Sequence, residues 1–152
     1  RRLAGGAPAG ACGRARGGLH MGLLFAGHPG LTPARPFGIL MPAGFDPVDM
    51  VTLPDGRLLI LTRRLELFPP RFASGLVLAD MARLDPARPL ATHELARIEG
   101  AGVRENYEGM ALRIARDGQI AVWLISDAND SAFQETRLMQ LRLDQEKLPP
   151  RE

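Results

Sequence analysis

The chain has 152 residues, enough for one ordinary domain with a buried core. Its 19 basic and 17 acidic residues give a net charge of only +2. Residues 1–36 hold five arginines and no acid, so the remainder is slightly acidic, and there is no basic stripe with interleaved aromatics of the kind that binds nucleic acid. The single cysteine, Cys12, excludes an internal disulfide and any multi-cysteine zinc site. We see no apolar run long enough for a transmembrane segment, and because the chain begins at Arg1 we expect a fragment.

The first 36 residues are rich in Gly, Ala, Arg and Pro and show no sustained period of two or of 3.6. Such a segment buries too little apolar area to offset its ordering entropy, so we expect residues 1–36 to be poorly ordered. The same composition is also typical of an out-of-frame reading of a GC-rich gene. The folded part is therefore expected to be residues 37–152.

From Phe37 onward the pattern predicts strands. Residues 48–53 and 57–62 flank Pro54-Asp55-Gly56, in which Asp-Gly is a strong hairpin signal. Residues 75–84 and 92–98 read as a third and a fourth strand. Residues 81–84 could instead form a helical turn.

A weak internal repeat follows. The segment Pro47-Val48-Asp49-Met50, followed by Asp55-Gly56, is echoed by Tyr107-Glu108-Gly109-Met110, followed by Asp117-Gly118. The second copy predicts three strands, at 107–115, 119–126 and 136–143, and the offset suits a four-stranded propeller blade. We therefore expect an all-β fold, an antiparallel β-propeller fragment holding about the last two blades, in which the N-terminus of the whole protein supplies the missing outer strand. A small β-sandwich is the alternative.

Oxygen-bearing side chains flank the second hairpin. A hairpin brings the residues before its first strand close to those after its second, so Asn106, Glu108, Asp127 and Asn129 are expected to share one sheet edge. Calcium prefers such carboxylate and amide oxygens, so the sequence predicts a Ca²⁺ site with Glu108, Asp127 and Asn129 as ligands, and with Asn106 and Asp49 as outer candidates. The alternative is that these Asn and Asp residues serve turns, and that Asp49 only starts a strand.

The residues around both hairpins resemble the phytase-like family, the domain with esterase-like activity of phytase. The resemblance covers roughly residues 37–144. It is carried mainly by Leu53-Pro54-Asp55-Gly56-Arg57, Asn106-Tyr107-Glu108-Gly109-Met110-Ala111 and Leu124-Ile125-Ser126-Asp127-Ala128-Asn129. It implies a β-propeller that is periplasmic or secreted, with further blades outside this chain.

The resemblance also implies a hydrolase acting on small-molecule phosphate esters or other esters with a bound divalent cation. Glu108 and Asp127 would be catalytic, and Arg63 and Arg64 would bind the substrate. The alternative is a non-catalytic exported propeller that binds a ligand or holds a structural calcium ion. No nucleic-acid partner is expected. Two positions where the family often has an acid differ here, Thr62 and Ala128.

Overall fold

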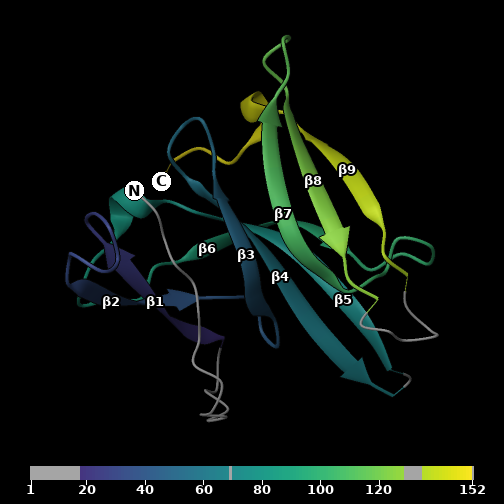
Figure 1. Cartoon of the computed structure of the whole chain (residues 1–152), viewed down its shortest axis with the longest axis horizontal. Coiled ribbons are helices and arrows are strands. Elements are labelled where there is room, and N and C mark those ends of the chain that lie inside the picture. Colours follow the sequence, from purple (N-terminus) through teal and green to yellow (C-terminus); the bar gives the residue numbers. More distant parts are fainter. Residues whose placement is uncertain (1–17, 69, 129–134, 152) are drawn as a thin grey trace.

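The protein is built from antiparallel strands. The computed structural model describes residues 18–68, 70–128 and 135–151. Within these residues nine strands form three antiparallel sheets (Figure 1), which confirms the predicted all-β class. The sheets are β1 (Leu19–Phe25) with β2 (Ala34–Leu40); β3 (Asp46–Thr52), β4 (Leu58–Leu67), β5 (Pro70–Ala79) and β6 (Thr92–Ile98); and β7 (Tyr107–Ile114), β8 (Ile120–Ser126) and β9 (Leu138–Leu143).

The strand expected at residues 75–84 ends early. β5 stops at Ala79, and the short 3₁₀ turn η1 (Met81–Arg83) follows, as the alternative interpretation of this segment predicted. Asp80 caps the turn because its Oδ1 accepts a hydrogen bond from the Ala82 amide at 3.1 Å. A second 3₁₀ turn, η2 (Gln145–Lys147), follows β9.

The two Asp-Gly turns have the same geometry. Gly56 and Gly118 have φ angles of 87° and 81°, a left-handed conformation that favours glycine. Oδ1 of Asp55 and Oδ1 of Asp117 each accept a hydrogen bond from the backbone amide two residues further on. Both predicted hairpins are therefore confirmed.

The internal repeat extends to a β-bulge. The register shifts between Pro47 and Asp49 where β3 pairs with β4, and between Tyr107 and Gly109 where β7 pairs with β8. Val48 and Glu108 are thus the extra residues at equivalent positions of two equivalent hairpins. The bulge matters for the site described below because it sets the direction in which the Glu108 side chain leaves the backbone of β7.

The core lies on both faces of the sheet formed by β3 to β6, which we call the central sheet. Leu59 and Leu61 pack toward the sheet of β7 to β9, whereas Leu58 and Ile60 pack toward the β1–β2 hairpin. All four are at most 4% exposed. A strand buried on both faces needs a continuous apolar run instead of alternation, which explains the sequence of β4.

The N-terminal segment differs from its prediction. β1 and the start of β2 lie within residues 18–36, so the expected lack of order does not hold there; residues 1–17 lie outside the described part. Phe37 and Ile39 of β2 are buried against the central sheet. An added Cβ at Gly22 would lie 2.4 Å from the Phe37 ring, so a glycine in β1 makes room for the packing of β2.

The three sheets follow one another as layers, with the central sheet in the middle (Figure 1). Across layers, β3 and β7, the first strands of their sheets, lie against each other. The described residues form no closed barrel, and the stacking is compatible with sandwich-like sheets. No helix in the described ranges is long and apolar enough to cross a membrane.

Candidate functional site

Three polar side chains join the central sheet to the β7–β9 sheet. Nη1 of Arg63 donates hydrogen bonds to Oδ1 of Asn106 at 2.5 Å and to Oε1 of Glu108 at 2.7 Å. Nδ2 of Asn106 donates to the same Glu108 oxygen at 2.7 Å. We call these three residues the Arg63 cluster.

The position of each member follows from its strand. Arg63 follows the buried run of β4 and, by the alternation of side chains in a strand, lies on the face of Leu61, which is turned toward β7. Asn106 immediately precedes β7 and is 1% exposed, while Glu108 is the bulged residue of β7. The Arg63 and Glu108 side chains are 33% and 37% exposed, so the cluster has a buried amide and a solvent-accessible ion pair.

Arg63 also contacts β5. Its guanidinium carbon lies 5.6 Å from the centre of the Phe72 ring, within cation–π range. Ser74 pairs with Arg63 in the β4–β5 register, so both side chains leave the sheet on the same face. Ser74 is fully buried, and its hydroxyl has no hydrogen-bond partner among the described residues. The sequence interpretation missed both β5 residues, although the period of two shared with Leu76 and Leu78 could have placed them on this face.

Asp49 connects the two sheets through the backbone. Its Oδ1 accepts from the amide of Met50 at 2.8 Å, and its Oδ2 accepts from the amide of Met110 in β7 at 2.7 Å. Both carboxylate oxygens of Asp49 are therefore engaged, Oδ1 within β3 and Oδ2 across to β7. Asp49 lies inside β3 and not at its start, and this arrangement gives its carboxylate a structural role.

Asp127 follows β8 directly and lies beside the cluster. Its backbone amide donates to the carbonyl of Asn106 at 3.1 Å. The residue before β7 and the residue after β8 therefore lie side by side, as predicted. Asn129, the remaining predicted ligand, lies outside the described residues. The structure thus brings Asn106, Glu108 and the backbone of Asp127 together.

Arg64 belongs to a different cluster. Neighbouring residues of a strand point to opposite faces, and Arg64 stacks on Phe45, whose ring centre is 4.9 Å from its guanidinium carbon. Its Nη2 donates to Oε1 of Glu66 at 2.7 Å. Glu66 is also hydrogen bonded to Arg71, which is the main cause of its lowered pKa. Of the two predicted substrate-binding arginines, only Arg63 lies with Glu108.

Thr62, which stands before Arg63 where the family often has an acid, has a structural role in this chain. Thr62 is 1% exposed, and its hydroxyl donates to the carbonyl of Gly75 at 3.2 Å. The equivalent residue after the second hairpin, Ser126, donates in the same way to the carbonyl of Glu135 at 2.7 Å. Both hydroxyls thus connect their strand to the following segment of the chain by a hydrogen bond.

Arg63 would compete with a cation for the oxygens of Asn106 and Glu108. The Arg63 guanidinium already lies at hydrogen-bond distance from the oxygens that would coordinate the ion, and its positive charge would repel it. The described ranges contain no group of three or more His, Cys, Asp or Glu side chains placed to hold a metal. Calcium binding is not tested by these observations and stays a prediction.

A comparison with protein-family models gives a match over residues 24–130 to the family called Phytase-like, described as esterase-like activity of phytase. The chain belongs to this phytase-like family. The predicted resemblance is therefore confirmed, and the matched region begins within the N-terminal segment expected to lie outside it. Comparisons with curated proteins and with solved structures each gave no significant match. The residues matched by the phytase-like family include Arg63, Asn106, Glu108 and Asp127.

Proposed function

We propose that this phytase-like chain is part of a hydrolase that acts on phosphate esters or other esters, with its reaction centre at the Arg63 cluster. The observation that carries the proposal is the hydrogen-bonded set of Arg63, Asn106 and Glu108, which lies inside the family match and is partly open to solvent. A partly exposed guanidinium beside a carboxylate supplies an anion-binding group and a proton acceptor in one place.

Arg63 would bind the substrate. Within the described residues its Nε and Nη2 donate no hydrogen bond, so these donors face a phosphate or carbonyl oxygen while Nη1 keeps Glu108 and Asn106 in position. A planar guanidinium stabilises charge that develops on such oxygens during the reaction. Phe72 supports the guanidinium from β5.

Glu108 would act as the base. One oxygen, Oε1, is held by Arg63 and Asn106, and Oε2 has no partner among the described residues. Oε2 would take a proton from a water whose oxygen forms a bond to the phosphorus or acyl carbon. The ester bond then breaks, and the leaving alcohol oxygen takes the proton that Glu108 accepted from the water; Asp127 would be the second carboxylate beside the reaction. No step is assigned to a bound metal.

We propose that the stacked sheets are part of a β-propeller. The proposal is supported by the repeated hairpin and bulge, and by the contact between the first strands of successive sheets, β3 and β7, as expected of strands near a common axis. In the described residues the sheet of β7 to β9 has one strand fewer than the central sheet. Remaining blades would come from chain outside this sequence, and export to the periplasm or the medium is proposed from the family.

A second function is favoured by one observation. The ion pair of Arg63 with Glu108 neutralises both groups, as in a network that only holds two sheets together. In that case the protein is a non-catalytic exported propeller that binds a ligand or holds a structural ion elsewhere.

Hydrolysis assays separate the two functions. p-Nitrophenyl phosphate and p-nitrophenyl acetate would be tested with the wild-type chain and with Glu108→Gln, which keeps an acceptor for Arg63 but removes the base. Glu146→Gln is the matched control, since Glu146 is exposed in η2 and lies outside the cluster. Each assay would be run with calcium and with chelator. Turnover that Glu108→Gln abolishes and the control retains supports the enzyme; absence of turnover on both esters supports the binding protein.

A further inference from the structure

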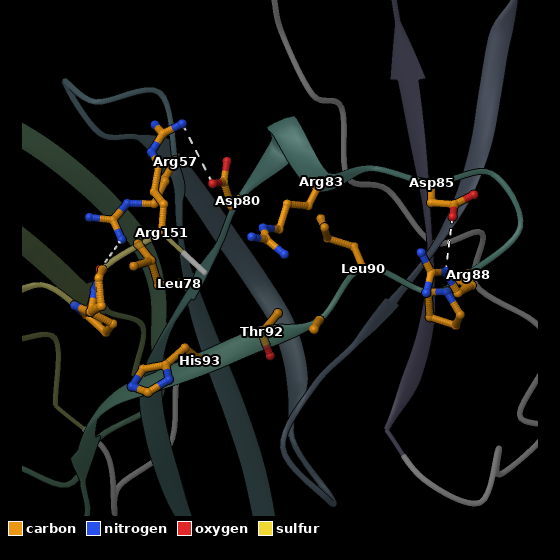
Figure 2. Close-up of a pocket in the computed structure, with 14 residues that line it drawn as sticks. Arg57, Leu78, Asp80, Arg83, Asp85, Arg88, Leu90, Thr92, His93 and Arg151 are labelled. Carbon is orange, nitrogen blue, oxygen red and sulfur yellow. Dashed lines mark hydrogen bonds and ion pairs between the residues drawn. The ribbon is translucent and has the colours of Figure 1, made fainter.

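A second polar pocket lies at the other end of the central sheet. It has a volume of about 360 Å³ and is formed by the end of β5, η1, the loop to β6 and the C-terminal segment (Figure 2). Its lining includes Arg57 at the start of β4, six residues from Arg63. At about 3.3 Å per residue these two positions are roughly 20 Å apart, so the pocket is separate from the Arg63 cluster.

Of the four arginines that line the pocket, one has no carboxylate partner among the described residues. Three of its four arginines have a carboxylate partner: the pairs are Arg57 with Asp55, Arg88 with Asp85 and Arg151 with Asp80, at 2.7, 3.1 and 3.7 Å. Arg83 of η1 forms no ion pair with any residue that the structure describes. Figure 2 shows its side chain pointing into the pocket between Leu78 and Leu90. A guanidinium without an ion-pair partner among the described residues therefore faces the pocket.

The wall of the pocket is partly apolar. Leu78 and Leu90 line it and are each 4% exposed, so their side chains are fixed by the surrounding core. The C-terminal segment closes one side, and Arg57 Nη1 holds it by donating to the carbonyl of Pro149 at 2.6 Å. Apolar walls with a few directed polar groups are typical of sites for small organic ligands.

We propose that this pocket binds a small organic anion, with its charged group on Arg83 and its apolar body against Leu78 and Leu90. The inference does not depend on the hydrolase proposal, because none of these residues belongs to the Arg63 cluster. His93 of β6 also lines the pocket (Figure 2).

Calorimetric titration of the whole chain with benzoate tests the proposal. Benzamide, a neutral analogue, and inorganic sulfate, an anion without an apolar body, are the reference ligands. We expect benzoate to bind more tightly than either. Arg83→Gln should raise its dissociation constant about fivefold, the size expected for loss of one exposed ion pair. Arg83→Lys, which keeps the charge, should restore part of the affinity.

Two control variants keep the result specific. Arg116→Gln removes an exposed arginine from the β7–β8 turn, and Arg63→Gln removes the guanidinium of the other site; both should leave benzoate affinity unchanged. Benzoate binding that Arg83→Gln does not weaken, or that Arg63→Gln weakens instead, would overturn the proposal. So would binding of benzamide or sulfate as tight as that of benzoate. Arg83 is exposed, so its replacement should leave the thermal unfolding midpoint unchanged and the comparison valid.

Discussion

Replacement of Arg63 by methionine should destabilise the protein, because the guanidinium connects two sheets. Methionine keeps an unbranched apolar side chain over Phe72 and removes only the charge and the donors. The change leaves Oδ1 of the buried Asn106 without its partner at 2.5 Å, while Nδ2 of Asn106 keeps its bond to Glu108. Glu108 loses its ion pair but keeps that amide donor.

The expected loss can be worked out from these contacts. An unsatisfied buried acceptor costs about 1–3 kcal/mol. The ion pair with Glu108 is one-third exposed and adds at most about 1 kcal/mol after solvent screening. We therefore expect the free energy of unfolding to fall by about 2 kcal/mol in all. For a chain of this length that corresponds to a decrease of about 4–8 °C in Tm.

Urea unfolding followed by the fluorescence of Trp123, in β8, measures this loss directly. Arg116→Met is the matched control, because Arg116 is exposed in the β7–β8 turn and should change the unfolding free energy by less than about 0.5 kcal/mol. If Arg63→Met is no more destabilising than Arg116→Met, the cluster does not hold the two sheets together and the argument is wrong.

Two further predictions concern the same sheets. Asp49→Asn replaces one acceptor oxygen by an NH₂ group facing the amide of Met50 or Met110, and should lower the unfolding free energy by about 1–3 kcal/mol. Asp46→Asn, at a side chain 80% exposed, is the control and should not lower it. Equal effects of the two variants in urea unfolding would refute the role of Asp49 in joining β3 to β7. The hydrogen bond from Arg97 lowers the pKa of Glu94, so the unfolded chain binds more protons than the folded one at acidic pH. Stability should thus fall as pH decreases from about 4.3 through the lower folded-state pKa, and less steeply in Glu94→Gln; the same slope in both proteins would contradict this.

Much of the fold could be predicted because it depends on local signals. The Asp-Gly pairs set two turns, and the apolar runs beside them predicted strands of the second and third sheets. The β1–β2 hairpin was missed because its order depends on distant packing. Gly22 looks like a flexible linker residue in sequence, yet it makes room for the Phe37 ring, which packs on the central sheet.

The candidate site was predicted in part for the same reason. The hairpin argument correctly placed Asn106 beside Glu108 and the backbone of Asp127 beside Asn106, since these positions follow from local pairing. It could not predict that Arg63, more than 40 residues earlier in the chain, donates hydrogen bonds to both Asn106 and Glu108, because this contact depends on how one sheet stacks on another. The sequence therefore suggested a metal ion where the described residues place a guanidinium. The prediction that Arg63 and Arg64 both bind the substrate was avoidable, since neighbouring strand residues point to opposite faces.

The proposed hydrolase function is tested most directly by the ratio of kcat/KM between the wild-type chain and Glu108→Gln in the presence of chelator. If Glu108 is the base and Arg63 the anion-binding group, the wild type should hydrolyse p-nitrophenyl phosphate or p-nitrophenyl acetate, and Glu108→Gln should be at least about a hundredfold slower. A Glu108→Gln variant as active as the Glu146→Gln control would contradict the assignment of the reaction to this cluster.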